Sequence, residues 1–145
     1  MQGREGSFVF HSFLFAPLSL SDFVGLYPLF SRWNADLPYI LGKHSGFGGK
    51  SRFNPDVGED ELRAMIQDVV KYPGSVALGN SSSADDGFGM ARRLVLVGCF
   101  SHSTGMKLCR SNSSKESSWE PVYCLRVVIN PETMWVVTAF PVKQV

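Results

Sequence analysis

A change of hydrophobic period at Pro73-Gly74 constrains the fold more than any other feature of the sequence. Before this point, apolar residues recur with the spacing of one helix face, which predicts an amphipathic helix over Asp56 to Tyr72. The apolar positions are Leu62, Met65, Ile66, Val69 and Val70. After Pro73-Gly74 the period falls to two, as in strands whose side chains alternate between two faces. A helical part followed by a strand-rich part indicates an α+β fold.

Turn residues divide the second half of the chain into short β-rich runs. The runs are Ser75 to Leu78, Ala91 to His102, Met106 to Arg110, Pro121 to Asn130 and Met134 to Val142. The last two are joined by Asn-Pro-Glu-Thr, which predicts an antiparallel hairpin because proline is pre-set for the turn. The serine-rich stretches Gly79 to Gly89 and Ser111 to Glu120 are predicted to be surface loops.

The spacing of apolar residues and the capping residues also predict helices in the N-terminal part. A helix is expected from Ser21-Asp22 to Trp33, interrupted at Pro28, and a short one from Asp36, with Pro38 in its first turn. The apolar run Phe8 to Phe15 is too short for its period to separate a strand from a buried helical turn. We therefore treat residues 1–35 as an apolar, helical segment and 36–145 as the main domain, within one compact unit.

Length, charge and cysteine content restrict the function. A chain of 145 residues is most simply one domain. The net charge of +1 lacks the basic excess usual in nucleic-acid-binding domains, so any anion site must be local. The three cysteines Cys99, Cys109 and Cys124 have no metal-module spacing, and we expect three free thiols kept reduced in the cytosol. The N-terminal run lacks a signal-peptide cleavage site and is too short to span a bilayer, so no membrane partner is expected.

The glycine-rich stretch LGKHSGFGGKSRF, Leu41 to Phe53, raises the question of a nucleotide loop. Gly49-Lys50-Ser51 matches the end of a Walker A motif, but His44 stands where its first glycine belongs. The stretch also fails to connect a buried strand to a helix, which phosphate binding at a helix N-terminus requires. A nucleoside-triphosphatase is therefore not indicated.

Other common reaction centres are also missing from the sequence. It contains no deaminase or zinc-protease motif, no G-x-S-x-G nucleophile and no spacing that would join His11, His44 and His102 at a metal. We expect no metal and no cofactor.

The same stretch is suited to acid-base chemistry on an anion. His44 titrates near neutrality and is surrounded in sequence by Lys43, Lys50 and Arg52, whose charges would lower its pKa and favour the neutral base. Metal-independent RNA cleavage needs a base for the 2′-hydroxyl, cations for the phosphorane and a proton for the leaving oxygen. The simpler interpretation is that His44 is a helix C-cap or surface residue and that the cations are solvated.

The order of these features resembles the ribonuclease superfamily that joins barnase, EndoU, colicin-type tRNA nucleases and RelE, which includes many bacterial toxin domains. The resemblance rests on Lys43-His44 after a short helix, the amphipathic helix Glu59 to Val70 and the final hairpin Val122 to Pro141. The hairpin ends in the motif VVTAFP, Val136 to Pro141. It implies N-terminal helices packed on a curved antiparallel sheet of four to five strands, with RNA across the sheet. It also implies a catalytic or phosphate-binding role for His44 and a hydroxyl contact from Thr138.

Strand alternation adds further candidates. Arg126 in the run Pro121 to Asn130 is either an edge residue reaching water or a cation aimed at the scissile phosphate. Thr138 has good β propensity, which alone would explain it. His102 at a strand end is either the partner acid or a turn residue. Lys107 and the pair Arg92-Arg93 would extend a phosphate track, although paired arginines at a strand start are usually solvated.

These observations favour a metal-independent endoribonuclease of the toxin type that acts on tRNA or other structured RNA. It would be monomeric, act in the cytoplasm after delivery or secretion into a target cell, and need a protein inhibitor (immunity protein) in the producing cell. The catalytic set is His44, Thr138, Arg126 and His102, and the phosphate-binding set is Lys43, Lys50, Arg52 and Lys107. The alternatives are a protein- or peptide-binding module using exposed Phe47, Phe53, Phe88 and Trp119, or an effector that acts on a host protein.

Overall fold

The chain folds into helices packed on β-sheets, in the α+β class that its two hydrophobic periods predict. The computed structural model describes residues 9–10, 13–14, 16–17, 32–45, 49–81, 91–110 and 117–143. Within this part lie helices α2 (Leu37–Lys43) and α3 (Glu59–Lys71). The strands are β1 (Val9–Phe10), β2 (Phe13–Leu14), β3 (Ala16–Pro17), β4 (Asn34–Ala35), β5 (Ser51–Phe53), β6 (Ser75–Ser81), β7 (Ala91–Cys99), β8 (Gly105–Arg110), β9 (Ser117–Val122), β10 (Cys124–Asn130) and β11 (Trp135–Val142).

Helix α3 confirms the amphipathic pattern of the sequence. Its five buried residues are Leu62, Met65, Ile66, Val69 and Val70, the positions that the spacing predicts. Glu59, Asp60 and Glu61 occupy the first turn, where negative charge interacts favourably with the helix dipole. The helix therefore has one apolar face, which must be covered by a sheet.

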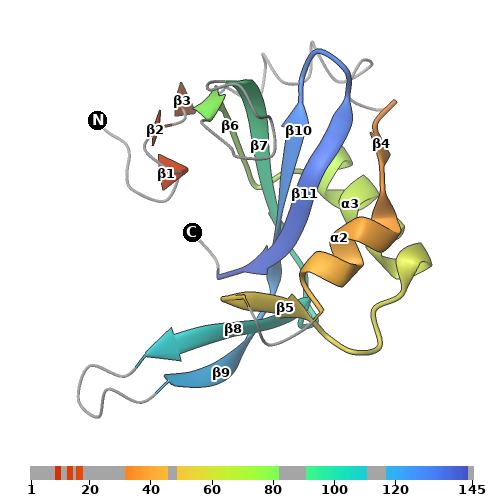
Figure 1. Ribbon diagram of the computed structural model, residues 1–145, viewed down its shortest axis with the longest axis vertical. Helices are drawn as coiled ribbons and strands as arrows, with labels where there is room; N and C mark the ends of the chain where they lie inside the picture. Colours follow the sequence, from red (N-terminus) through yellow and green to blue (C-terminus); the bar gives the residue numbers. More distant parts are fainter. Residues whose placement is uncertain are drawn as a thin grey trace.

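The main sheet has the strand order β3-β6-β7-β10-β11-β4. Its neighbouring strands run antiparallel, except that β4 pairs in parallel with β11 (Figure 1). The predicted hairpin is confirmed, because β10 and β11 pair from Cys124 opposite Val142 to Asn130 opposite Trp135. In its turn, the side chain of Asn130 accepts a hydrogen bond from the backbone N–H of Glu132 at 2.9 Å.

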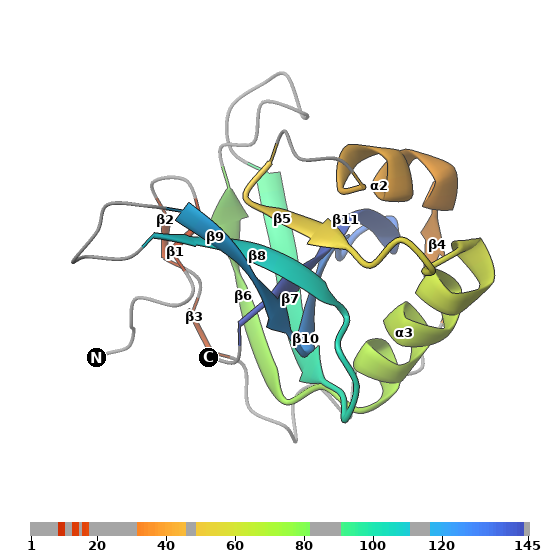
Figure 2. The same ribbon diagram turned by 90° about the horizontal axis from the view of Figure 1, so that it is seen from below.

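A second sheet, with the order β5-β8-β9, crosses one end of the main sheet (Figures 1 and 2). The sequence missed this arrangement and indicated a single antiparallel sheet of four to five strands. The predicted run Pro121 to Asn130 divides at Tyr123 into β9 and β10, one in each sheet. The predicted loop Ser111 to Glu120 is also shorter than expected, because Ser117 already pairs with Arg110. A polar strand such as β9 is stabilised by its pairing partner, which sequence periodicity does not reveal.

The core lies between α3 and one face of the main sheet. The sheet contributes alternate apolar residues to it, namely Leu94, Leu96, Leu125, Val127, Ile129, Val136 and Ala139. The contact is close, since a Cβ atom on Gly98 would lie 2.9 Å from Cγ2 of Val69. The opposite face of the sheet also holds apolar clusters, but it includes Arg93, Arg126 and Thr138 among its residues. We call these the helix-covered face and the polar face.

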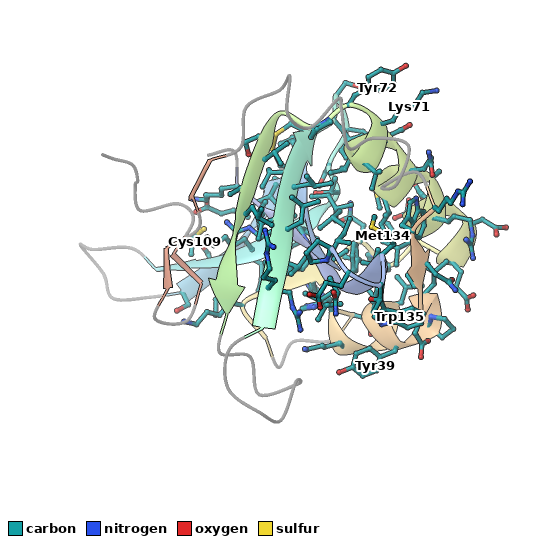
Figure 3. The ribbon with its side chains drawn as sticks, turned by 90° about the horizontal axis from the view of Figure 1, so that it is seen from above. Tyr39, Lys71, Tyr72, Cys109, Met134 and Trp135 are labelled. Carbon is teal, nitrogen blue, oxygen red and sulfur yellow. A yellow bond between two sulfur atoms is a disulfide. The ribbon has the colours of Figure 1, made fainter. Side chains whose placement is uncertain are left out.

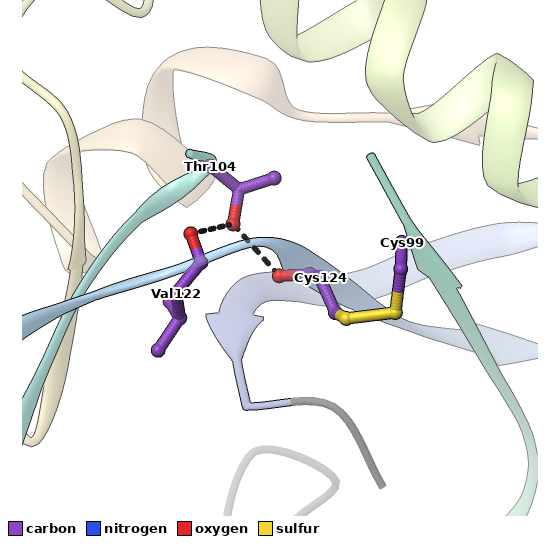
Figure 4. The surroundings of a disulfide bond; sticks show 4 residues. All are labelled: Cys99, Thr104, Val122 and Cys124. Carbon is purple, nitrogen blue, oxygen red and sulfur yellow. Dashed lines mark hydrogen bonds between the residues drawn. A yellow bond between two sulfur atoms is a disulfide. The ribbon is translucent and has the colours of Figure 1, made fainter. Parts of the chain in front are cut away.

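The expectation of three free thiols is wrong. Cys99 and Cys124 form a disulfide between β7 and β10, where the antiparallel register places them directly opposite each other (Figure 4). The hydroxyl of Thr104 donates to the carbonyl oxygen of Cys124 at 2.8 Å beside this bond. Cys109 is a free thiol, half-buried on β8. The sequence does not reveal this disulfide, because only the register of β7 and β10 brings the two cysteines together.

The N-terminal segment contributes strands to both edges of the main sheet. β3 pairs with β6 at one edge, and β4 pairs with β11 at the other. The predicted helix from Ser21 to Trp33 lies outside the described residues except at its last two positions, where Trp33 donates a 2.8 Å hydrogen bond to Gln67 of α3. The run Phe8 to Phe15 includes the short strands β1 and β2, which pair with each other. No helix in the described ranges is long and apolar enough to cross a membrane.

Candidate active site

Helix α2 determines the position of His44. The carboxylate of Asp36 accepts a hydrogen bond from the backbone N–H of Tyr39 at 3.1 Å, and Pro38 occupies the first turn, as the sequence predicts. At the other end, the backbone N–H of His44 donates to the carbonyl oxygens of Ile40 and Leu41, both at 3.2 Å. His44 is therefore the C-cap of the helix through its backbone, and this leaves its imidazole available for another role.

The imidazole of His44 contacts Thr138 on β11. The two atoms His44 Nε2 and Thr138 Oγ1 lie 3.2 Å apart, although 94 positions separate the residues in sequence. The ring also packs against Phe140, with centroids 5.4 Å apart, and meets Phe53 edge-on at 6.3 Å. The backbone fixes this arrangement further, because the N–H of Phe53 donates to the carbonyl oxygen of His44 at 2.7 Å. The two residues that the resemblance selected thus meet in space.

A β-bulge helps to orient Thr138. Val128 pairs with Thr138 while the next residue, Ile129, pairs with Val136, so that Val137 is the extra residue of β11. Bulges locally change strand twist and the direction of nearby side chains, and they are common beside active sites. Thr138, which is 8% exposed, lies on the polar face of the sheet in reach of His44.

Burial keeps His44 neutral. The pKa of its imidazole falls from 6.5 to about 4, first because burial disfavours the charged form and second because Lys43 is adjacent. The sequence predicts this direction from the neighbouring cations, but burial is the larger cause. At neutral pH the ring therefore has one nitrogen free of a proton, and it can accept one from a reacting group.

Arg126 lies on the same face of the sheet as Thr138. Its guanidinium carbon is 5.6 Å from the centroid of the Phe140 ring, the same ring that packs on His44. The interpretation of Arg126 as an edge residue is wrong, because β10 is paired on both sides, by β7 and β11. Burial lowers the pKa of Arg126, yet an arginine keeps its charge at physiological pH. Arg126 is thus a cation within the face that carries His44 and Thr138.

The predicted phosphate-binding residues lie in two places: Lys43 beside His44, and the other three at or next to the three-stranded sheet. Lys43 is adjacent to His44, and its Nζ lies 5.9 Å from the centroid of the Tyr39 ring. Lys50 is exposed just before β5. Arg52 and Lys107 belong to the three-stranded sheet, where the guanidinium of Arg52 lies 5.0 Å from the centroid of Trp119. Lys43 is the one that the structure places directly beside the histidine.

The two-histidine centre stays a prediction, because the described contacts of His44 and of His102 involve different residues. Strand β7 ends at Cys99, so His102 lies in the turn before β8, as its alternative interpretation indicates. It is exposed, and its ring packs on Phe100 with centroids 5.5 Å apart. His44 pairs with a hydroxyl instead, and His11 lies outside the described residues. Among the described side chains, no group of three or more His, Cys, Asp or Glu is placed to hold a metal ion.

Two site residues were missed at the level of sequence. Phe140 contacts both His44 and Arg126, and the signal for it is its position two residues after Thr138, on the same side of a strand. Phe53 was expected to be an exposed aromatic, yet it is 3% exposed and packs against His44.

Comparison with protein-family models, with curated proteins and with solved structures finds no match to this chain. The ribonuclease resemblance therefore stays a prediction, and the function must be inferred from the site itself.

Proposed function

We propose that this protein is a metal-independent endoribonuclease of the toxin type that cleaves tRNA or another structured RNA. The observation that carries the proposal is the contact between His44 Nε2 and Thr138 Oγ1 at 3.2 Å, on a face that also presents Arg126. A neutral imidazole, a hydroxyl and nearby cations are the groups that attack by a 2′-hydroxyl requires.

The roles follow from the chemistry of each group. Neutral His44 accepts the proton of the 2′-hydroxyl as its oxygen bonds to phosphorus, and the bond from phosphorus to the 5′-oxygen breaks. Arg126 and Lys43 stabilise the additional negative charge of the phosphorane. Thr138 orients the imidazole, and the ammonium of Lys43, adjacent to His44, donates a proton to the leaving 5′-oxygen. The products are a 2′,3′-cyclic phosphate and a 5′-hydroxyl.

The deciding experiment is incubation of the protein with total RNA in the presence of EDTA. Wild-type protein should cleave RNA and leave cyclic phosphate ends, whereas a His44→Ala variant should not. A Tyr72→Ala variant is the control and should keep the activity, because Tyr72 is an exposed side chain at the end of α3 that has no role in the proposed reaction. Equal cleavage by the wild type and His44→Ala, or none by either, would contradict the proposal.

The delivery of such a toxin is part of the same proposal. Its action would be cytoplasmic, and an inhibitor protein would protect the cell that makes it. The disulfide between Cys99 and Cys124 supports passage through an oxidising compartment, because such bonds form and persist there. Expression with and without a co-expressed inhibitor would test the requirement for protection.

The alternative of a binding module has less support. Of its four aromatic residues, Phe53 is buried in the core and Trp119 lies against Arg52. Phe47 and Phe88 lie outside the described residues. That alternative predicts tolerance of changes at His44, which the RNA assay measures directly.

A further inference from the structure

We propose that a cavity beside the His44–Thr138 pair binds an unpaired nucleobase of the RNA and selects the nucleotide near the cleaved bond. This inference rests on the proposed ribonuclease function and adds a specificity site to it. The cavity is distinct from the catalytic pair, and of the residues that the sequence suggested for RNA binding it includes only Arg93.

The cavity lies between α2 and the turn end of the β10–β11 hairpin and has a volume of about 490 Å³. Its polar and aromatic lining residues are Asp36, Tyr39, Arg93, Asn130, Thr133 and Trp135. Aliphatic side chains of α2 and β11 complete the wall. A cavity of this size lies in the range of small-ligand sites and is larger than a bound water needs.

The two aromatic residues favour a flat ligand. Tyr39 is 51% exposed and Trp135 is 42% exposed, and both project from neighbouring elements at the α2 end of the sheet (Figure 3). Large aromatics so exposed and gathered at one cavity are suited to stacking. Unpaired RNA bases bind proteins mainly by stacking on such side chains and by hydrogen bonds from their edges.

The polar residues of the cavity can read a base edge or hold a phosphate. Of the Arg92-Arg93 pair, which was expected to be solvated, Arg92 is exposed but Arg93 is 2% exposed. Arg93 lines the cavity, and its Nη1 donates to the carbonyl oxygen of Arg92 at 2.8 Å. Asn130 and Thr133 add amide and hydroxyl groups on the hairpin turn. A cation together with hydrogen-bonding groups suits a nucleotide better than an apolar ligand.

Two structural connections link the cavity to the catalytic pair. Along β11, Trp135 is about 10 Å from Thr138 at the usual strand rise, and the bulge residue Val137 lines the cavity next to Thr138. Along α2, the ammonium of Lys43 lies 5.9 Å from the Tyr39 ring and is adjacent to His44. A base stacked on Tyr39 would therefore bring its phosphate past Lys43 toward the imidazole.

The test compares Tyr39→Ala and Trp135→Ala with Tyr72→Ala. Tyr72 is the control because it is an exposed aromatic, 72% accessible, at the end of α3. Cleavage of a library of single-stranded oligoribonucleotides should show that both cavity variants lose the nucleotide preference at one position near the cut. Their KM should rise about 5- to 150-fold, the effect of losing one stacked base, while Tyr72→Ala stays unchanged. Wild-type preference and KM in both cavity variants would overturn the inference and leave the ribonuclease function intact.

A binding measurement separates the inference from the catalytic proposal. Nucleoside monophosphates should quench tryptophan fluorescence of a His44→Ala protein, and the quenching should disappear when Trp135→Phe is added. If the wild type cleaves no RNA but this quenching is present, the cavity binds nucleotides and the catalytic proposal fails. If quenching is absent or persists without Trp135, the cavity does not bind a base.

Discussion

The two faces of the main sheet are built from the same strands and differ in the polarity of their side chains. The helix-covered face is apolar along the central strands, with Leu94 and Leu96 on β7 and Leu125 and Val127 on β10. On the polar face, the intervening positions include Arg93 and Arg126 as well as valines. Strand alternation lets the same strands form an apolar core on one side and a mixed apolar and polar face on the other.

The reason for this division is the cost of burying charge. A guanidinium under α3 would lose its hydration without a compensating partner, which costs several kcal/mol. On the polar face, Arg126 is half-buried beside the ring of Phe140. Arg93 is buried there, at 2% exposed, and its Nη1 donates to the carbonyl oxygen of Arg92 at 2.8 Å. The comparison predicts that changes on the helix-covered face affect stability, whereas changes on the polar face affect activity.

The largest effect is expected for His44→Ala. Removal of the general base should lower kcat for RNA about 10²- to 10⁴-fold with little change in the melting temperature. The measurement is initial cleavage rates with a defined tRNA, together with thermal unfolding. A His44→Ala protein that unfolds much more easily, with activity per folded molecule intact, would contradict the assignment of stability to one face and activity to the other.

Leu125→Ala and Arg126→Met change adjacent residues on opposite faces of β10. Leu125 is fully buried under α3, and its truncation should lower the free energy of unfolding by about 2–5 kcal/mol. Arg126→Met keeps a side chain of similar length and should reduce cleavage more than stability. Chemical denaturation and RNA cleavage on both variants check this, and the reverse pattern would show that the two faces are not distinct in role.

The next effect in size is expected from loss of the disulfide, which joins β10 to β7 and stabilises the fold. Cys99 and Cys124 are 25 residues apart, so the double variant Cys99→Ala/Cys124→Ala should lose about 2–4 kcal/mol of stability. Denaturant midpoints under oxidising and reducing conditions measure the loss. The control is Cys109→Ala, whose midpoint should respond to reductant as the wild type does.

Asp36→Ala should have a smaller effect, on both the stability of the protein and RNA cleavage. Loss of the hydrogen bond to the N–H of Tyr39 should destabilise α2 by about 1 kcal/mol, and His44 at the other end of this short helix should be held less well. Asp36→Asn keeps the cap and is the matched control. Unchanged cleavage in Asp36→Ala would show that the contact with Thr138 holds His44 without the cap.

A separate effect, seen only on acidification, is a pH dependence of stability. The pKa of His44 is about 4 in the folded protein, below its ordinary 6.5, so the unfolded chain binds the proton more tightly. The stabilising contribution is therefore complete above pH 6.5 and is lost as the pH falls toward 4. Unfolding at several pH values should show a shallower slope in this window for His44→Ala, and an identical slope would indicate that the histidine is not held neutral.

The sequence predicted the elements whose pattern is local. Helix α3, helix α2 with its Asp36 cap and the β10–β11 hairpin lie where spacing and turn residues indicated. His44 and Thr138 were selected by a family pattern, and their contact was not predicted, because no local rule connects residues so far apart in the chain. Strand β9 was missed because its residues are polar and its stability depends on β8.

The sequence by itself determined the α+β class, the apolar face of α3 and the alternation that separates charge from core. Only the tertiary structure decided that Cys99 lies opposite Cys124, that Arg126 is on a central strand, that His102 packs on Phe100 in the turn before β8 and that Arg93 lines a cavity. The physical reason is that helix period and turn chemistry act over a few residues. Strand order and register instead depend on the free energy of the whole sheet, to which every pair of strands contributes.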